Sequence, residues 1–228
     1  MYYDSSRKGS TVFALLGVFC FVALALTPEP LAEAVTEEAG VIETIGALGF
    51  LLAMVLAAVI AWRSTGVVRV YFMVWAALTA IFFGEETSWL QHYLDFDTPL
   101  AYRELNAQGE LNIHNLVPLQ GGSLVEGEVS IGTFFKSQNL FRLGFLVYFG
   151  VLPILALMRT RVGGLIRRAK IPVIGPRDLI SSWSVIVVSF LLVVMGAFDS
   201  PLAEAREAFY GLVILRFVAA HFRRPGEE

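Results

Sequence analysis

Two neighbouring stretches decide how this chain is read: GEETSWLQH at residues 84–92 and NAQGELNIHN at residues 106–115. They follow an apolar run of membrane-spanning length, and they supply three carboxylates and two imidazoles: Glu85, Glu86, Glu110, His92 and His114. Such groups are costly to place where a helix leaves a bilayer, and where they occur they usually have a function. The sequence therefore predicts a polar site at the end of a membrane helix.

The composition of the whole chain supports the membrane class. Hydrophobic residues make up 56% of 228, the mean hydropathy is +0.67, and Phe alone occurs 18 times. A soluble domain could not cover so much apolar surface. The net charge of -3 gives no sign of a nucleic-acid partner, so we expect the lipid bilayer as the main partner and no nucleic acid. The single Cys20 lies in the first apolar run and can form no disulfide within the chain.

Six apolar runs come close to the ~20 residues that a bilayer requires. They predict an all-α polytopic helix bundle, a single membrane domain over residues 1–228, with spans at about 11–26, 39–62, 67–84, 140–158, 179–198 and 205–222. The first run also fits a secretory signal peptide, but we expect a membrane helix. The sixth contains Arg216, which we expect to extend toward the membrane surface. Five spans and one interfacial helix are the alternative.

The orientation follows from the distribution of Lys and Arg. With a cytoplasmic N-terminus, twelve basic residues lie inside and four outside, namely Arg103, Lys136, Arg142 and Arg206. This is the sense that the positive-inside rule expects, so both termini should be cytoplasmic. The inside loop 159–177 carries six of the twelve and lies either against anionic headgroups or in solvent.

The outer loop between the third and fourth spans, residues 85–139, is too long to be structureless in a compact protein, so we expect it to be ordered. Its first part should continue the third helix to about Phe96, which would put Glu85, Ser88 and His92 on one face. In its second part, Glu110 and His114 share a face whether the backbone is extended or helical. We also expect the helix-end carboxylates Glu43 and Glu207 to lie near Glu85 and Glu86.

These motifs resemble a pattern found in a group of uncharacterised multi-span bacterial membrane proteins. The resemblance rests on G-E-E-x-S-W-x-Q followed by N-A-Q-G-E-x-N-x-H-N, and covers about residues 84–116. It implies a bacterial inner (plasma) membrane location and a site on the periplasmic face. His92 departs from the pattern, because the position after Gln91 is usually another residue. The resemblance implies no activity.

The candidate catalytic residues are Glu85, Glu86, Gln91, Glu110 and His114. A carboxylate of raised pKa could act as a general base on a lipid-type substrate with His114 assisting. Two carboxylates and an imidazole, here Glu86, Glu110 and His114, could instead hold a divalent metal, which would be the cofactor. The sequence has no H-E-x-x-H motif and no pair of E-x-x-H motifs, so the spacing gives the metal no further support.

The alternative function is a non-catalytic accessory or structural subunit of a larger membrane complex. The polar groups would then satisfy the backbone of an ordered loop that packs over the helix ends. A transporter is disfavoured, because ionisable groups gather at the outer helix ends and the inner halves are apolar. We expect His221 to face the headgroups beside Arg223 and Arg224. Whether the chain is an enzyme stays open at this point.

Overall fold

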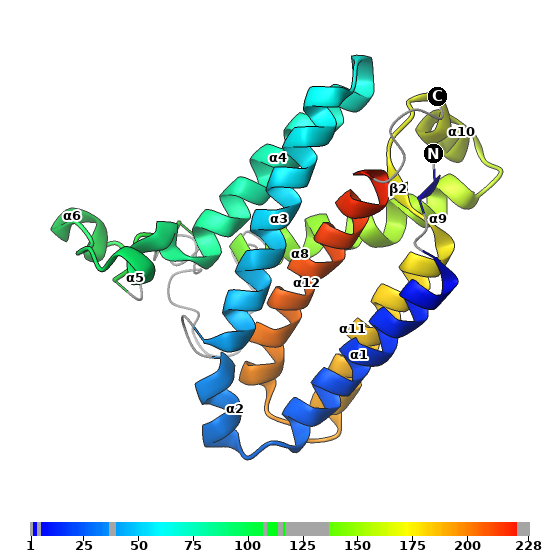
Figure 1. The fold of residues 1–228 in the computed structure, drawn as a ribbon. Helices are drawn as coiled ribbons and strands as arrows, with labels where there is room; N and C mark the ends of the chain where they lie inside the picture. Colours follow the sequence, from blue (N-terminus) through cyan, green and yellow to red (C-terminus); the bar gives the residue numbers. More distant parts are fainter. Residues whose placement is uncertain are drawn as a thin grey trace, which may run out of the picture.

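The computed structural model describes residues 2–3, 6–36, 40–106, 109–113, 116 and 137–222, and most of them are helical (Figure 1). The longer helices are α1 (Arg7–Leu26), α2 (Glu29–Thr36), α3 (Val41–Arg63), α4 (Gly66–Glu86), α8 (Ser137–Leu146), α10 (Arg161–Arg168), α11 (Pro176–Val194) and α12 (Asp199–Phe222). The shorter elements are β1 (Tyr2–Tyr3), η1 (Ser88–Leu90), α5 (Gln91–Leu94), α6 (Leu100–Arg103), η3 (Val147–Val151), α9 (Leu152–Leu157) and β2 (Val173–Ile174). The two strands pair in parallel.

Five helices in the described part of the chain are long and apolar enough to cross a membrane. They are α1, the helix that ends with α3, α4, the continuous segment that ends with α9, and α11. The prediction of an all-α, multi-span membrane protein is confirmed at this level, and each of the first five predicted spans overlaps one of these helices. The sixth predicted span lies in α12, which is not among the five.

α12 nevertheless occupies the centre of the bundle, between α3 and the α1–α11 pair (Figure 1). Small residues let α12 lie directly on α3. A Cβ atom added to Gly46 would come within 2.7 Å of the Ala208 Cα, and one added to Gly211 within 2.8 Å of the Gly46 carbonyl oxygen. Backbones approach this closely only where side chains are absent, as is common between membrane helices.

α1 and α11 form a second close pair beside this unit (Figure 1). A Cβ atom on Gly17 would lie 2.9 Å from the Val185 side chain, so the two helices are also in close contact. The rings of Phe13 and Phe21 reach Phe209 of α12, with centroid distances of 5.2 and 6.1 Å. These rings join the pair to the central helix.

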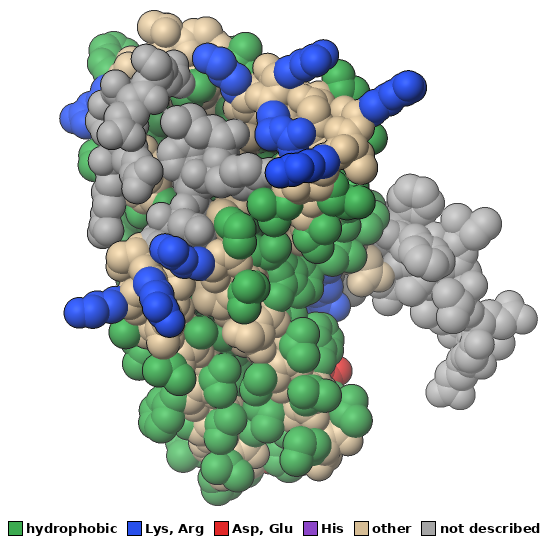
Figure 2. Space-filling model, turned by 90° about the vertical axis from the view of Figure 1, so that its right-hand side faces the viewer, with side chains coloured by type: hydrophobic (Ala, Val, Ile, Leu, Met, Phe, Trp, Pro, Cys, Tyr) green, Lys and Arg blue, Asp and Glu red, His purple; other side chains and the backbone are tan. Residues whose placement is uncertain are grey.

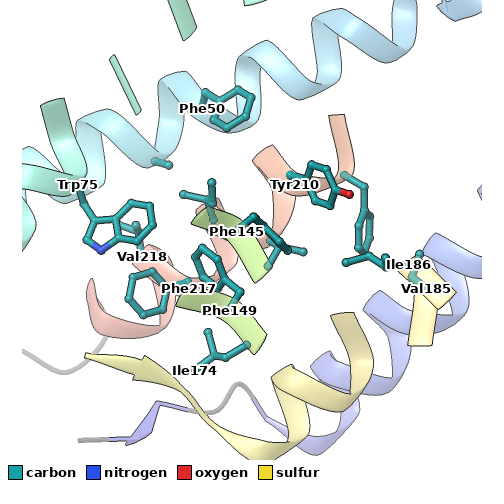
Figure 3. Packing of buried hydrophobic residues seen from close by; sticks show 14 of the residues in the cluster. Phe50, Trp75, Phe145, Phe149, Ile174, Val185, Ile186, Tyr210, Phe217 and Val218 are labelled. Atoms are coloured by element: carbon teal, nitrogen blue, oxygen red, sulfur yellow. The ribbon is translucent and has the colours of Figure 1, made fainter. Parts of the chain in front are cut away.

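Aromatic side chains fill the space where α4, α8, η3 and α12 meet. Phe149 lies 4.8 Å from Phe145 and 5.4 Å from Phe217, with Trp75 on one side and Tyr210 on the other (Figure 3). Phe149 and Phe217 are almost completely buried. Large rings in offset and edge-to-face contact contribute packing energy beyond the area they bury, so this cluster fixes how the segment before α9 sits against α12.

The segment from α8 to α9 contains a π-helical turn, η3. Pro153 follows it and has no N–H to donate to the carbonyl of Phe149, four residues earlier. The indole Nε1 of Trp183 on α11 donates to that carbonyl at 2.9 Å. A neighbouring helix therefore satisfies the backbone group that proline leaves open, as buried backbone at membrane depth requires.

Arg216 extends toward the first turns of α1 and α11, the helix ends that the prediction puts at the inner membrane surface, but it lies in a buried ion pair there and not among headgroups. Its guanidinium donates to the carboxylate of Asp178 on α11 at 2.5 Å and to the hydroxyl of Ser10 on α1 at 2.8 Å. Ser10 in turn donates to Asp178 at 2.7 Å, and the Asp178 side chain is only 4% exposed. A buried partner of opposite charge removes the reason to extend toward water, so Arg216 joins three helices.

His221 was expected to face the headgroups, and it is instead buried. Its ring lies 4.5 Å from that of Phe217 and 5.1 Å from that of Phe72, and its Nδ1 is 2.7 Å from the Phe217 carbonyl oxygen. One turn of helix separates His221 from Phe217, so both share the face of α12 that packs on α4.

Asp178→Asn should destabilise the protein by about 3–5 kcal/mol, because it leaves the Arg216 charge buried without a carboxylate. The double variant Asp178→Leu/Arg216→Met should recover most of this loss, since apolar side chains of similar volume often replace a buried ion pair at little cost. Thermal unfolding of the purified protein measures both changes.

Arg142→Gln is the control, because it breaks the partly exposed ion pair with Glu207 and should cost about 1 kcal/mol or less. A double variant as unstable as Asp178→Asn would show that the packing of these side chains, rather than the paired charge, holds the three helices together.

Candidate functional site

α4 ends at Glu86, and the chain then makes a left-handed turn. Ser88, Trp89 and Leu90 have φ angles of 44°, 56° and 68°, a conformation that costs a residue other than glycine roughly 1–2 kcal/mol. The expected continuation of the third helix to about Phe96 is therefore wrong, and only the four residues of α5 return to a helix. Three consecutive residues in this region persist only where their surroundings hold them.

Neighbouring residues of the first motif hold the turn from one side. The backbone N–H of Leu90 donates to the Thr87 carbonyl at 2.8 Å and to its hydroxyl at 3.3 Å. The indole of Trp89 lies against Gly84, where a Cβ atom would come within 2.8 Å of a ring carbon. Its Nε1 donates to Glu85 Oε1 at 2.9 Å. Because Gly84 has no side chain, the Trp89 ring can lie directly against its backbone.

A buried cluster holds the turn from the other side. Ser88 Oγ donates to Glu110 Oε2 at 2.5 Å, and Asn112 Nδ2 donates to the same oxygen at 2.8 Å and to Ser88 Oγ at 3.0 Å. The exposed fractions of Ser88, Glu110 and Asn112 are 3%, 7% and 1%. The second motif therefore folds back onto the first, and the strained residue Ser88 is at the point of contact.

Asn106 closes the second motif on itself. Asn106 Nδ2 donates to the carbonyl and the side-chain oxygen of Asn112 at 2.8 and 2.9 Å. The Glu110 N–H donates to Asn106 Oδ1 at 3.1 Å. The hydroxyl of Tyr102 donates to the Asn112 carbonyl at 2.9 Å. Burial and then the charge of Glu85 raise the pKa of Tyr102, so its hydroxyl stays protonated and able to donate at neutral pH.

Glu85 and Gln91 hold backbone rather than face an open space. Glu85 Oε2 accepts from the Ile113 N–H at 2.7 Å, and Gln91 Oε1 accepts from the Leu111 N–H at 2.8 Å. Gln91 Nε2 also donates to Thr98 Oγ1 at 2.7 Å. We call these interacting side chains the loop network: Glu85, Ser88, Gln91, Asn106, Glu110 and Asn112.

Glu86 belongs to a different cluster, at the ends of α3, α4 and α12. A Cβ atom on Gly46 of α3 would lie 3.5 Å from Glu86 Oε1, and the charges of Glu43, Glu204 and Glu207 all act on Glu86. The expectation that Glu43 and Glu207 lie near Glu85 and Glu86 is confirmed for Glu86, whereas Glu85 binds the loop backbone. Arg142 of α8 donates to Glu207 at 2.9 Å and offsets part of this negative charge.

The predicted metal site is not assembled by the described residues. Among them, no group of three or more His, Cys, Asp or Glu side chains could hold a metal ion. Glu86 and Glu110 have different neighbours, and His114 and the side chain of His92 lie outside the described part of the chain. The metal set Glu86, Glu110 and His114 stays a prediction.

The two motifs contain all residues of the loop network, but the sequence does not predict its geometry. Ser88 was assigned to a helix face with Glu85 and His92, and nothing in the sequence indicated that it pairs with Glu110. Asn106 and Asn112 are polar residues of the second motif, in which polar and apolar or small residues alternate. Thr98 belongs to neither motif and carried no signal.

In comparisons with known proteins, no family model, no curated protein and no solved structure matches this chain. The resemblance of the two motifs to a group of bacterial membrane proteins therefore stays a prediction. What the site does must be argued from its own chemistry, in which the polar groups of both motifs bind one another and the loop backbone.

Asn112→Asp should cost up to about 3 kcal/mol at neutral pH, because it replaces a donor to Glu110 with a second buried carboxylate. Glu110→Gln alone should cost about 1 kcal/mol. The pair Glu110→Gln/Asn112→Asp exchanges donor and acceptor, so it should be more stable than Asn112→Asp alone. Thermal unfolding and the protease resistance of the loop in the purified protein measure the coupling.

Glu104→Gln removes a charge from an exposed side chain of the same loop and should leave both measurements unchanged. Additive effects of the two network substitutions would contradict the direct pairing of Glu110 with Asn112.

Proposed function

We propose that this chain is a six-span protein of a bacterial inner membrane and that α12 is its sixth span. α12 has 24 residues, a length of roughly 36 Å at 1.5 Å per residue, which is enough to cross the hydrocarbon core. Its charges make its sequence too polar for a lipid-facing helix, but Arg206 and Arg216 are paired with Asp199 and Asp178. A central helix needs no apolar outer surface.

Six spans put both ends of the chain on one side of the membrane, which we propose is the cytoplasm. The twelve-to-four distribution of basic residues supports this orientation. Two of the four outer basic residues, Arg142 and Arg206, are engaged in ion pairs with carboxylates. The loop that carries both motifs would then lie in the periplasm, and the chain would fold as one membrane domain.

Cysteine labelling tests this orientation. In a Cys20→Ala background, Ala101→Cys should react with a membrane-impermeant maleimide added to spheroplasts, and Gly164→Cys should react only after permeabilisation. Ala101 is exposed, and a Cβ atom at Gly164 meets no other atom within 4 Å, so neither change should disturb the fold. The reverse labelling pattern would place the loop in the cytoplasm.

We further propose that the chain is a non-catalytic subunit of a larger membrane complex and that its outer loop is a docking element. The observation that carries this proposal is the loop network, because its carboxylate and amides are used to hold backbone and one another. A catalytic carboxylate must reach a substrate, and Glu110 is 93% covered within a set of internal hydrogen bonds.

The surface of the loop indicates what the network is for. Trp89, Leu90, Tyr93, Leu94, Phe96, Leu100, Leu105 and Ile113 are large apolar residues outside the five candidate spans, and each is more than a third exposed. α5 and α6 extend beyond the end of α4 (Figure 1). A rigid element with exposed aromatic and aliphatic residues is typical of a protein interface.

An enzyme remains the second candidate, and the cluster around Glu86 is what favours it. The charges of Glu43 on α3 and of Glu204 and Glu207 on α12 all act on Glu86 of α4, and like charges gathered around one carboxylate are a feature of acid–base sites. In this proposal Glu86 is the general base for a lipid-type substrate. The subunit proposal is preferred because three of the predicted catalytic residues, Glu85, Gln91 and Glu110, belong to the loop network instead.

The size of the native complex tests the subunit proposal. Leu94→Gln and Leu100→Gln, at positions 65% and 77% exposed, should release the chain from a large complex in blue native electrophoresis of membranes from its natural host. Met195→Gln, equally exposed at the end of α11, and Glu86→Gln should leave the complex intact. A wild-type chain that migrates alone, or loss of the complex in Glu86→Gln only, would overturn the proposal.

A further inference from the structure

The connection between α9 and α11 lies at a membrane surface. α9 ends at Leu157 and α11 begins at Pro176, and both belong to candidate membrane helices. α10 lies between them, and its first turn is capped by the Thr160 hydroxyl, which accepts from the Gly163 N–H at 3.2 Å. We call residues 159–170 the α10 surface. A helix placed between two spans in this way can lie along the bilayer.

One face of α10 is fixed to the protein. Ile166 is buried with Ala156 and Val173, and Gly163 lies so close to the end of α9 that a Cβ atom would clash with its carbonyl oxygens. The guanidinium of Arg167 donates to the carbonyls of Ala156 and Met158 and so closes the end of α9. Arg167 is therefore structural, and the helix has a defined orientation.

The other face is exposed in the part of the chain that the structure describes, and it combines apolar with basic residues. Leu165 is 63% and Val162 49% exposed. Arg161, Leu165 and Arg168 follow at i, i+4 and i+7, so two exposed basic side chains flank the exposed leucine on one stripe. Helices with this arrangement lie in the interface, where the apolar residues enter the bilayer and the basic ones stay at the headgroups.

The charged residues in the segment 159–177 are all basic. Residues 159–177 contain Arg159, Arg161, Arg167, Arg168, Lys170 and Arg177 and no Asp or Glu, and the next carboxylate, Asp178, is buried with Arg216. Figure 2 shows Lys and Arg side chains in the upper part of this side of the molecule, above a mainly hydrophobic lower part. Anionic lipid headgroups are the partner that such a surface attracts at a bilayer.

Lys170 occupies a backbone position at the end of α10 in which glycine would be more stable. Its φ angle is 53°, its N–H donates to the Arg167 carbonyl at 3.1 Å, and the Ile171 N–H donates to the Ile166 carbonyl at 3.3 Å. This pair of bonds is the helix ending in which glycine is strongly preferred, because it alone takes a positive φ without strain. The exposed lysine therefore makes the end of α10 less stable than glycine would.

We propose that the α10 surface is a binding site for anionic phospholipids. Leu165 and Val162 enter the acyl boundary, and Arg161, Arg168 and Lys170 bind the phosphate groups of headgroups around them. The site is independent of the outer loop and of any activity of the chain. It goes beyond the proposed subunit function, and each can fail without the other.

Native mass spectrometry of the full-length protein tests this site with two probes, phosphatidylglycerol and phosphatidylcholine added in matched detergent micelles. The wild type should retain phosphatidylglycerol preferentially. Arg168→Gln and Lys170→Gly should each lower that affinity about fivefold, the effect of one basic residue near an anionic surface. Arg103→Gln, a matched charge loss on α6, should have no effect.

Lys170→Gly separates lipid binding from folding. Because glycine relieves the positive φ, this variant should unfold at the same temperature as the wild type or higher while binding phosphatidylglycerol more weakly. Equal retention of both lipids by the wild type, or an undiminished affinity in Lys170→Gly and Arg168→Gln, would overturn the proposal.

Discussion

The close approach of α3 and α12 is the constraint on which the bundle depends. Gly46 and Gly211 leave no room for side chains between the two backbones, so α12 is drawn to the centre and surrounded by protein. Once there, its Arg206, Arg216 and His221 side chains are buried against other helices instead of facing lipid. Arg216 then needs Asp178, and this need brings α11 and α1 to the opposite side of α12. The close contact at Gly46 and Gly211 thus determines which helices the charged side chains of α12 can face.

In the outer loop, hydrogen bonds between side chains offset the cost of an unfavourable backbone conformation. The left-handed residues Ser88, Trp89 and Leu90 aim the Ser88 hydroxyl into the cluster of Glu110 and Asn112. The residues of the loop network and Gly84 each have an identifiable task there: an acceptor for a backbone N–H, a donor to another side chain, or an absent side chain under an indole. Such a loop is specified by internal consistency, and catalysis is not needed to explain why its residues are of these types.

The sequence predicted the helical membrane fold well, because 20-residue apolar runs have few other interpretations. It could not predict that Arg216 is paired, because Asp178 lies 38 positions away and no local pattern joins them. It also could not predict the turn after Glu86. Ser88, Trp89 and Leu90 have no intrinsic preference for positive φ, and part of what holds that conformation is contact with residues more than twenty positions later. Glu110 was identified as a site residue by its type, whereas its partners depend on the fold.

The pairing of α1 with the last helices has a consequence for biosynthesis. Ser10 bonds to residues 168 and 206 positions later, so α1 enters the membrane long before its partners are translated. α3, α4 and the motifs of the outer loop make contacts much closer in sequence and can assemble first, since short loops close at lower entropic cost. Until α11 and α12 arrive, Ser10 on α1 has no charged partner within the chain, and α1 is the part of the nascent protein with most to gain from an insertase or a chaperone.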